Sequence, residues 1–206
     1  MEASKYMTKR MILLTGGARS GKSSYAEKLA KDIGNRVLYV ATASPSPLVV
    51  SSRQDTQGGD EEMKRRIAAH KQARPAHWGT LETPVKVAEG LTREGSGYDV
   101  ILIDCVTLLT NNVLCLHMDK NGEIDNESAV ENDVRKEIQS IIDYIKINMV
   151  SAIIVTNEVG LGLIPLGAST RLYRDVLGRA NQMLAQAVDE VYFMISGLPL
   201  KIKPQA

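Results

Sequence analysis

The eight residues Gly16–Ser23 read GGARSGKS and match the pattern G-x-x-x-x-G-K-[ST]. Glycines allow consecutive backbone N–H groups to curl around phosphate oxygens. Lys22 reaches the β- and γ-phosphates in such a loop, and the hydroxyl of Ser23 is a ligand for Mg²⁺. The pattern predicts a nucleoside-triphosphate cradle formed by Gly16, Gly17, Ala18, Arg19, Ser20, Gly21, Lys22 and Ser23.

Two acidic side chains follow apolar runs elsewhere in the chain. Asp104 ends the run Val100–Asp104, and a carboxylate at the end of a strand in such folds faces the metal and its waters. We therefore expect Asp104 to bind Mg²⁺ together with Ser23. Asn157 and Glu158 follow a second run, and both a role in orienting water or substrate and a purely structural loop role fit them.

The segment 60–78, DEEMKRRIAAHKQARPAHW, places a histidine among cations. Arg66 and His70 are four residues apart and share one helix face, and Lys71 and Arg74 follow. Neighbouring cations favour neutral imidazole, which is a good nucleophile toward phosphorus. The spacing alone leaves a second interpretation open, in which His70 is a solvated residue on a helix surface.

The other histidines suggest no chemistry. His77 lies in a Pro-Ala-His-Trp turn and His117 in a polar loop, so structural roles are expected for both. The stretch 117–128 resembles a calcium-binding loop, but the positions that need carboxylates hold His117 and Ser128. A calcium site is therefore not expected.

Alternating apolar runs and amphipathic segments must position these residues. Strands are expected at Met11–Thr15, Val37–Ala41, Val100–Asp104, Ala152–Thr156 and Val191–Ile195. Helices are expected at Lys22–Ile33, Glu61–Lys71, Glu127–Asn148 and Thr170–Ala187. The alternation predicts an α/β protein with a P-loop NTPase-like, three-layer fold, in which helices flank a mostly parallel central sheet. We expect one domain at 11–206 after a polar extension at 1–10, with long loops at Ser44–Gly59 and His117–Asn126.

Composition excludes several classes of protein. The 206 residues are 44% hydrophobic and 24% charged, which is typical of a globular domain. A net charge of +1 and an aromatic content of 4% disfavour nucleic-acid binding. No run is long enough for a membrane span or a secretory signal, and Cys105 and Cys115 suggest neither a disulfide framework nor a zinc site. We therefore expect a cytoplasmic protein.

Several blocks together are similar to one known family. They include MILLTGGARSGKSSYAEKLA, VLYVATAS, the HK-x-x-RPAHW segment, DVILIDCVTLLTNNVL and VTNEVGLGLIPLGAST, and the likeness covers roughly residues 11 to 203. The chain resembles the bifunctional adenosylcobinamide kinase / adenosylcobinamide-phosphate guanylyltransferases of cobalamin biosynthesis. A generic P-loop protein would share only the first block.

The resemblance implies two reactions at one site. ATP or GTP phosphorylates the aminopropanol hydroxyl of the corrinoid adenosylcobinamide, and GMP is then transferred from GTP to that phosphate, which gives adenosylcobinamide-GDP and pyrophosphate. The second reaction passes through a guanylylated histidine, which by position is His70. The resemblance also implies a homotrimer, and further nucleotide contacts at Ala41, Thr42, Ala43, Lys71, Gln72, Ala73, Arg74, Glu82 and Asp104.

The chain departs from the family pattern in three places. The first ten residues are extra, and Ser44–Gly59 is longer than the usual link to the histidine segment. Ala69 stands where some members carry a second histidine, which favours His70 as the nucleophile. Two other functions remain open: a plain P-loop kinase of small molecules, in which His70 has no role, and a nucleotide-binding switch. The absence of an N-K-x-D motif, with which regulatory GTPases recognise the base, argues mildly against the switch. The sequence therefore does not indicate which nucleotide base the cradle prefers.

Overall fold

A computed structural model describes residues 9–43, 65, 68 and 74–204. The expected helix Glu61–Lys71 and the expected loop Ser44–Gly59 therefore lie, entirely or almost entirely, outside the described residues. The same is true of the site candidates His70, Lys71, Gln72 and Ala73.

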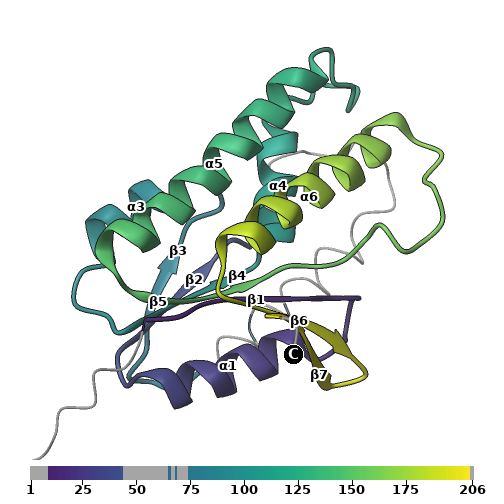
Figure 1. The fold of residues 1–206 in the computed structure, drawn as a ribbon. Helices are drawn as coiled ribbons and strands as arrows, with labels where there is room; N and C mark the ends of the chain where they lie inside the picture. Colours follow the sequence, from purple (N-terminus) through teal and green to yellow (C-terminus); the bar gives the residue numbers. More distant parts are fainter. Residues whose placement is uncertain (1–8, 44–64, 66–67, 69–73, 205–206) are drawn as a thin grey trace, which may run out of the picture.

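One seven-stranded sheet forms the centre of the molecule (Figure 1). Its order is β3-β2-β4-β5-β1-β6-β7, and every neighbouring pair is parallel except β6 and β7. The five expected strands are all present, so the mostly parallel sheet is confirmed. The strands are β1 (Met11–Gly16), β2 (Val37–Ala41), β3 (Gly79–Glu82), β4 (Val100–Asp104), β5 (Ser151–Val155), β6 (Glu190–Ile195) and β7 (Leu198–Lys203).

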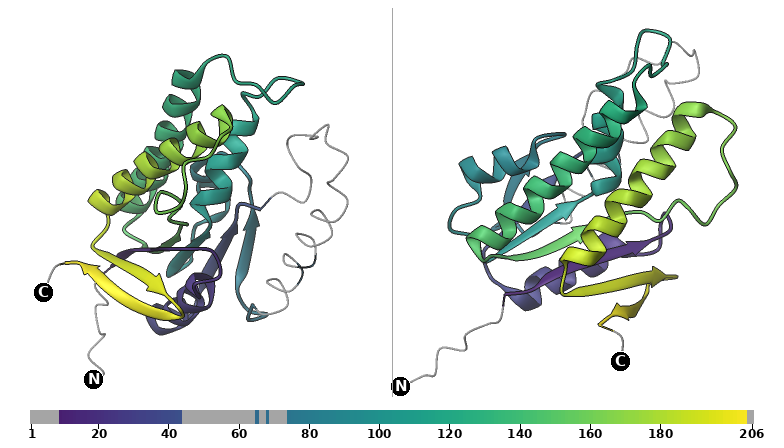
Figure 2. Two further views of the ribbon diagram at one scale, coloured as in Figure 1. Left: turned by 90° about the vertical axis from the view of Figure 1, so that its right-hand side faces the viewer. Right: turned by 45° about the horizontal axis from the view of Figure 1, so that its top comes forward.

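Helices cover both faces of the sheet, as the three-layer prediction requires (Figures 1 and 2). Successive side chains of a strand point to opposite faces, so Ile12 and Leu14 pack on the α1 side, while Met11 and Leu13 pack on the other. Helix α1 (Lys22–Ile33) covers one face, and no other helix among the described residues lies there. The opposite face carries α3 (Val87–Glu94), α4 (Val106–Cys115), α5 (Glu127–Asn148) and α6 (Ala168–Ala187).

Two helix predictions agree with the structure to the residue, at α1 and α5. Asn126 explains where α5 begins, because its side chain accepts a hydrogen bond from the backbone N–H of Ala129 at 3.0 Å. Helix α6 begins two residues before the expected Thr170. Four elements were not expected at all: β3, β7, α3 and α4.

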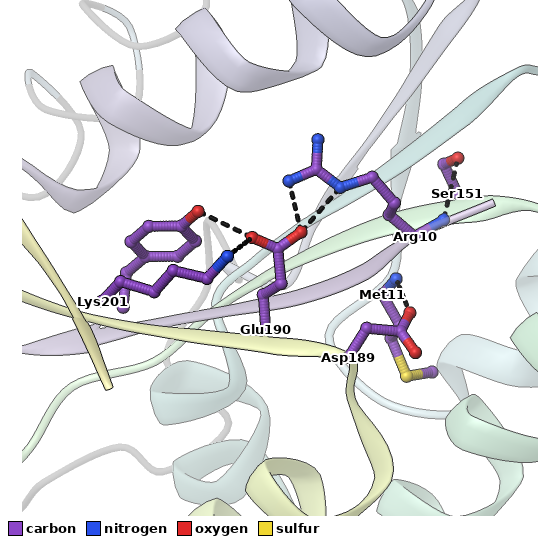
Figure 3. A network of polar contacts seen from close by, with 7 residues as sticks. Arg10, Met11, Ser151, Asp189, Glu190 and Lys201 are labelled. Carbon is purple, nitrogen blue, oxygen red and sulfur yellow. Dashed lines mark hydrogen bonds and ion pairs between the residues drawn. The ribbon is translucent and has the colours of Figure 1, made fainter. Parts of the chain in front are cut away.

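A polar network joins the start of β1 to the C-terminal hairpin (Figure 3). Buried Glu190 accepts hydrogen bonds from Arg10, from Lys201 Nζ at 2.7 Å and from the Tyr192 hydroxyl at 2.7 Å. Burial raises the pKa of Glu190, but the hydrogen bonds from its partners outweigh burial and lower the pKa to about 2. Arg10, which was expected to belong to a polar extension, therefore helps to anchor β6 and β7.

We expect Glu190→Gln to lower the free energy of unfolding by about 2 kcal/mol at pH 7, because it leaves two cations beside a neutral amide. A carboxyl whose pKa is lower in the folded state stabilises the fold above the pKa that it has in the unfolded chain. The contribution then fades as the pH falls through the folded value. Urea unfolding of both proteins should therefore show a gap at pH 7 that shrinks from about pH 5 downward. A gap that is absent at pH 7, or as large at pH 3, would contradict this, and exposed Glu94→Gln is the control.

Candidate active site

The predicted cradle connects β1 to α1 at the carboxyl edge of the sheet. The backbone turns sharply there, with φ values of +144° at Gly16, +58° at Arg19 and +90° at Gly21. Gly21 takes the left-handed conformation immediately before the first turn of α1. Gly17, Ala18 and Arg19 are exposed, whereas Ser20 and Lys22 are buried and Ser23 is half-buried.

The ammonium of Lys22 lies inside this turn. Its Nζ donates to the carbonyl oxygens of Gly16 at 3.0 Å and Gly17 at 2.6 Å, and lies 3.4 Å from the hydroxyl of Ser20. Burial lowers the pKa of Lys22, and the nearby Cys105 and Asp104 partly oppose this effect. The positive charge is therefore held at the centre of the loop, on the side that faces the end of β4.

The turn between β6 and β7 supports the cradle from behind. The N–H of Gly197 donates to the carbonyl of Ser20 at 3.0 Å. A Cβ on Gly21 would lie 3.1 Å from the Cα of Gly197, so the two chains touch closely. No sequence motif pointed to this support, because the hairpin lies more than 170 residues away.

We expect Gly16→Ala to lower the free energy of unfolding by about 2–4 kcal/mol. The new Cβ would lie 2.5 Å from the carbonyl oxygen of Met194, a backbone atom, at a φ that L-residues rarely adopt. Gly17→Ala is the matched control, since nothing lies within 4 Å of a Cβ there. Urea unfolding of the two variants measures the difference, and equal stabilities would show that the turn tolerates a side chain at Gly16.

The ends of β2, β3 and β4 bring three more site candidates into one row. Ala41 pairs with Glu82 of β3 on one side and with Asp104 of β4 on the other. Asp104 is half-buried and Glu82 is exposed. The row continues through β5 to β1, so these residues and the cradle share one edge of the sheet.

Buried Thr42 joins the ends of β2 and β4. Its hydroxyl donates to the carbonyl of Cys105 at 2.7 Å and accepts from the N–H of Cys105 at 2.8 Å, beside the cis peptide bond between Asp104 and Cys105. The side chain of Asn112 donates to the carbonyl of Thr42 at 2.8 Å. The side chain of Thr42 is therefore used to fix the end of β4, while Ala43 is half-buried beside it.

Arg74 is the one described member of the four adjacent candidates 71–74. Its guanidinium carbon lies 3.5 Å from the centre of the Tyr39 ring. The hydroxyl of Tyr39 in turn donates to Asp104 Oδ2 at 2.7 Å. Tyr39 thus connects two candidates that are 30 residues apart in the sequence, and it was not itself a candidate.

A second polar network positions Asn157 and Glu158 beside the cradle. The N–H of Glu158 donates to the carbonyl of Gly16 at 3.0 Å, and that of Asn157 donates to the Thr107 hydroxyl at 2.6 Å. Asn181 of α6 accepts from the Thr156 hydroxyl at 2.7 Å and donates to the carbonyl of Asn157 at 3.0 Å. These hydrogen bonds fix the backbone of Asn157 and Glu158 beside the cradle.

The loop that follows is apolar and exposed. Arg171 holds its backbone by donating to the carbonyl oxygens of Pro165 and Leu166. Four large side chains on it are 69–97% exposed: Leu161, Leu163, Ile164 and Leu166. These four side chains therefore leave much apolar surface uncovered on this loop.

Among the residues that the structure describes, no three or more His, Cys, Asp and Glu side chains gather where a metal ion could bind. The same residues form no helix with the length and hydrophobicity of a transmembrane segment. His77 is exposed, and His117 contacts Asp133 at 3.1 Å on the surface.

A parallel sheet whose first strand runs through a glycine-rich, lysine-centred turn into a helix defines a P-loop nucleotide-binding protein of the α/β class. Within that class, the family model for cobinamide kinase / cobinamide phosphate guanyltransferase matches residues 12–202. The chain belongs to this family.

Three relatives are similar over almost their entire length. The bifunctional adenosylcobalamin biosynthesis protein CobU of Escherichia coli (strain K12) is 40% identical over 197 residues, which are 94% of this chain and 99% of that protein. CobU of Salmonella typhimurium (strain LT2) is 40% identical over 94% and 99% of the two chains. CobP of Pseudomonas aeruginosa (strain PAO1), which carries the same description, is 41% identical over 93% and 96%. The crystal structure of the RadB recombinase covers 89% of this chain and 73% of its own at a TM-score of 0.46 and 10% identity.

Proposed function

We propose that this protein phosphorylates adenosylcobinamide with ATP or GTP, and then transfers GMP from GTP to the new phosphate to give adenosylcobinamide-GDP and pyrophosphate. One observation carries the proposal: the family match at residues 12–202 includes both the cradle Gly16–Ser23 and the segment His70–Arg74. The three relatives named as bifunctional adenosylcobalamin biosynthesis proteins match over almost the whole chain.

In the first reaction the cradle binds the triphosphate and the corrinoid hydroxyl attacks the γ-phosphorus. The ammonium of Lys22 exchanges its contacts with Gly16 and Gly17 for phosphate oxygens. It then stabilises the negative charge that grows on the bridging oxygen as the bond to the γ-phosphorus breaks. The exposed Gly17–Arg19 backbone offers further N–H donors at the same place.

The residues present also fit Mg²⁺. This ion is commonly held by one or two protein oxygens together with phosphates and water, and Ser23 and Asp104 supply a hydroxyl and a carboxylate at the same sheet edge. The Tyr39 hydroxyl bonds to only one carboxylate oxygen of Asp104, namely Oδ2. When bound, Mg²⁺ neutralises charge on the phosphate oxygens.

In the second reaction we assign the nucleophile to His70. Its imidazole nitrogen forms a bond to the α-phosphorus of GTP, and the bond to the pyrophosphate oxygen breaks. An oxygen of adenosylcobinamide-phosphate then displaces the histidine, so two in-line displacements retain configuration at phosphorus. We assign nucleotide contacts to Ala41, Thr42, Ala43, Lys71, Gln72, Ala73, Arg74 and Glu82.

We also propose a single domain at 11–206 and a homotrimer in the cytoplasm. An exposed apolar row on the edge strand β7, formed by Leu198, Leu200 and Ile202, supports self-association, because a second copy can cover it. The cytoplasm holds the proposed co-substrates, ATP and GTP. Analytical ultracentrifugation measures the oligomeric state.

Incubation with adenosylcobinamide, followed by mass spectrometry, tests the proposal. With ATP alone we expect adenosylcobinamide-phosphate, and with GTP added we expect adenosylcobinamide-GDP and one pyrophosphate for each turnover. Phosphorylation of the corrinoid without guanylyl transfer would indicate a plain small-molecule kinase. Hydrolysis of nucleotide with no transfer to the corrinoid would favour the switch.

A further inference from the structure

Tyr39 lies where the two halves of the proposed site meet. It is the third residue of the five-residue strand β2 and is 2% exposed, so its ring has a fixed place on the α1 face of the sheet. Its hydroxyl donates to Asp104 Oδ2 at 2.7 Å, and its ring carries the Arg74 guanidinium at 3.5 Å from the ring centre. One side chain therefore contacts a candidate metal ligand and a candidate nucleotide-binding cation.

The contact with the ring defines how the guanidinium lies. An aromatic face attracts a guanidinium electrostatically, and the attraction grows when water is excluded. Nε of Arg74 is buried and has no hydrogen-bond partner among the residues that the structure describes. The aromatic face is thus a contact that holds this guanidinium flat, and a lysine, which has no planar group, would lose that flat stacking.

The hydroxyl of Tyr39 contacts Asp104. The phenol O–H donates to Asp104 Oδ2 at 2.7 Å from a side chain that is almost fully buried. Its bond to Oδ2 fixes the rotation of the Asp104 carboxylate. We assign Asp104 to both reactions, because Mg²⁺ accompanies either triphosphate, and Arg74 to the guanylyl transfer, because it follows His70 by four residues. The hydroxyl of Tyr39 therefore affects both reactions, whereas its ring affects the guanylyl transfer alone.

We propose that Tyr39 is a positioning residue of the guanylyl-transfer step, in which its ring holds the Arg74 guanidinium in place for GTP while its hydroxyl orients Asp104. This inference rests on the proposed function and deepens it. It adds a residue that acts through Arg74 and Asp104 and needs no contact with substrate.

Two substitutions separate the ends of the side chain. Tyr39→Phe removes the hydroxyl and keeps the ring, and Tyr39→Leu removes both. Two rates are measured for each variant: labelling of the protein by α-labelled GTP in a single turnover, and phosphorylation of adenosylcobinamide by ATP. We expect Tyr39→Phe to slow both reactions by similar factors. We expect Tyr39→Leu to slow protein labelling roughly tenfold further than Tyr39→Phe does, with no matching further loss of phosphorylation.

A double-mutant cycle tests whether the ring acts through Arg74. Arg74→Lys keeps the charge but loses the flat contact with the ring. It should slow labelling roughly tenfold when residue 39 is tyrosine or phenylalanine, and less than about twofold when residue 39 is leucine. Equal losses in all three backgrounds would overturn the inference, as would a parallel loss of both reactions in Tyr39→Leu.

Thermal unfolding shows whether each variant is folded at the assay temperature, and Tyr39→Met replaces Tyr39→Leu if the latter is not. The failure of this inference is distinguishable from that of the proposed function. If the wild-type protein takes no label from GTP, the proposed guanylyl-transfer step is wrong, and the role of Tyr39 is wrong with it. If the wild-type protein is labelled but the effects of the substitutions are additive, only the role of Tyr39 is wrong.

Discussion

His70→Ala should abolish guanylyl transfer, lowering its rate by roughly 10⁴-fold or more, the scale on which an enzyme loses activity with its covalent nucleophile. Alanine offers no nitrogen to the α-phosphorus, and water or the corrinoid phosphate would have to displace pyrophosphate directly. Phosphorylation should keep most of its rate, because attack on the γ-phosphorus uses the cradle and Asp104 but not the imidazole. Parallel assays of both products with one enzyme preparation measure the ratio.

His77→Ala is the matched control for this prediction. It removes the same side chain from an exposed turn seven residues further along the chain. We expect both reactions to be unchanged in this variant. An equal loss of both reactions in His70→Ala would instead assign His70 a role in binding or folding.

Lys22→Ala should slow both reactions by about 10²–10³-fold, which is the usual effect of removing one preorganised donor to a transition-state oxyanion. The buried ammonium lies at the centre of the cradle, against the carbonyl oxygens of Gly16 and Gly17, where the polyphosphate common to both reactions would bind. Steady-state rates of the two transfers, with ATP and with GTP, check the prediction.

The control for Lys22 is Lys28→Ala, which removes an exposed ammonium from the same helix. It should leave both rates within about twofold of wild type, since surface charges away from a site contribute little. If Lys22→Ala slowed only one reaction, the two transfers would not share the cradle.

Four of the five strands that the sequence predicted are buried on both faces of the sheet, and the fifth, β6, is partly exposed. β1, β2, β4 and β5 lie between neighbours and between helices, so nearly every position is apolar and the run is visible. β3 lies at an edge and buries only Leu81 of its four residues, and β7 lies at the other edge with its apolar row exposed. Neither edge strand has a continuous buried run, and pattern alone does not reveal them.

The sequence did not predict helices α3 and α4, for related reasons. α4 follows β4 after a single residue and buries seven of its ten residues, so its apolar pattern reads as a continuation of the strand. α3 has only eight residues, two turns, which is too short for a periodic pattern to stand out.

The cradle was predictable because all of its residues are local in sequence and glycine is needed at defined positions. The contacts that position its surroundings are not local. Tyr39 meets Asp104 across 65 residues, Asn157 meets Thr107 across 50, and Thr156 meets Asn181 across 25. A hydroxyl or an amide on a strand or helix gives no local sign of a partner so far away. The catalytic role of His70 stays a prediction, since this residue lies outside those that the structure describes.

We propose that one chain both cradles a triphosphate and becomes guanylylated on His70. The most direct test is to incubate the protein with GTP, without corrinoid, and to map the modified peptide by mass spectrometry. We predict one guanylyl group for each labelled chain on the peptide that contains His70, in an acid-labile and alkali-stable linkage. An unmodified protein, or a guanylyl group on any other residue, would contradict the account.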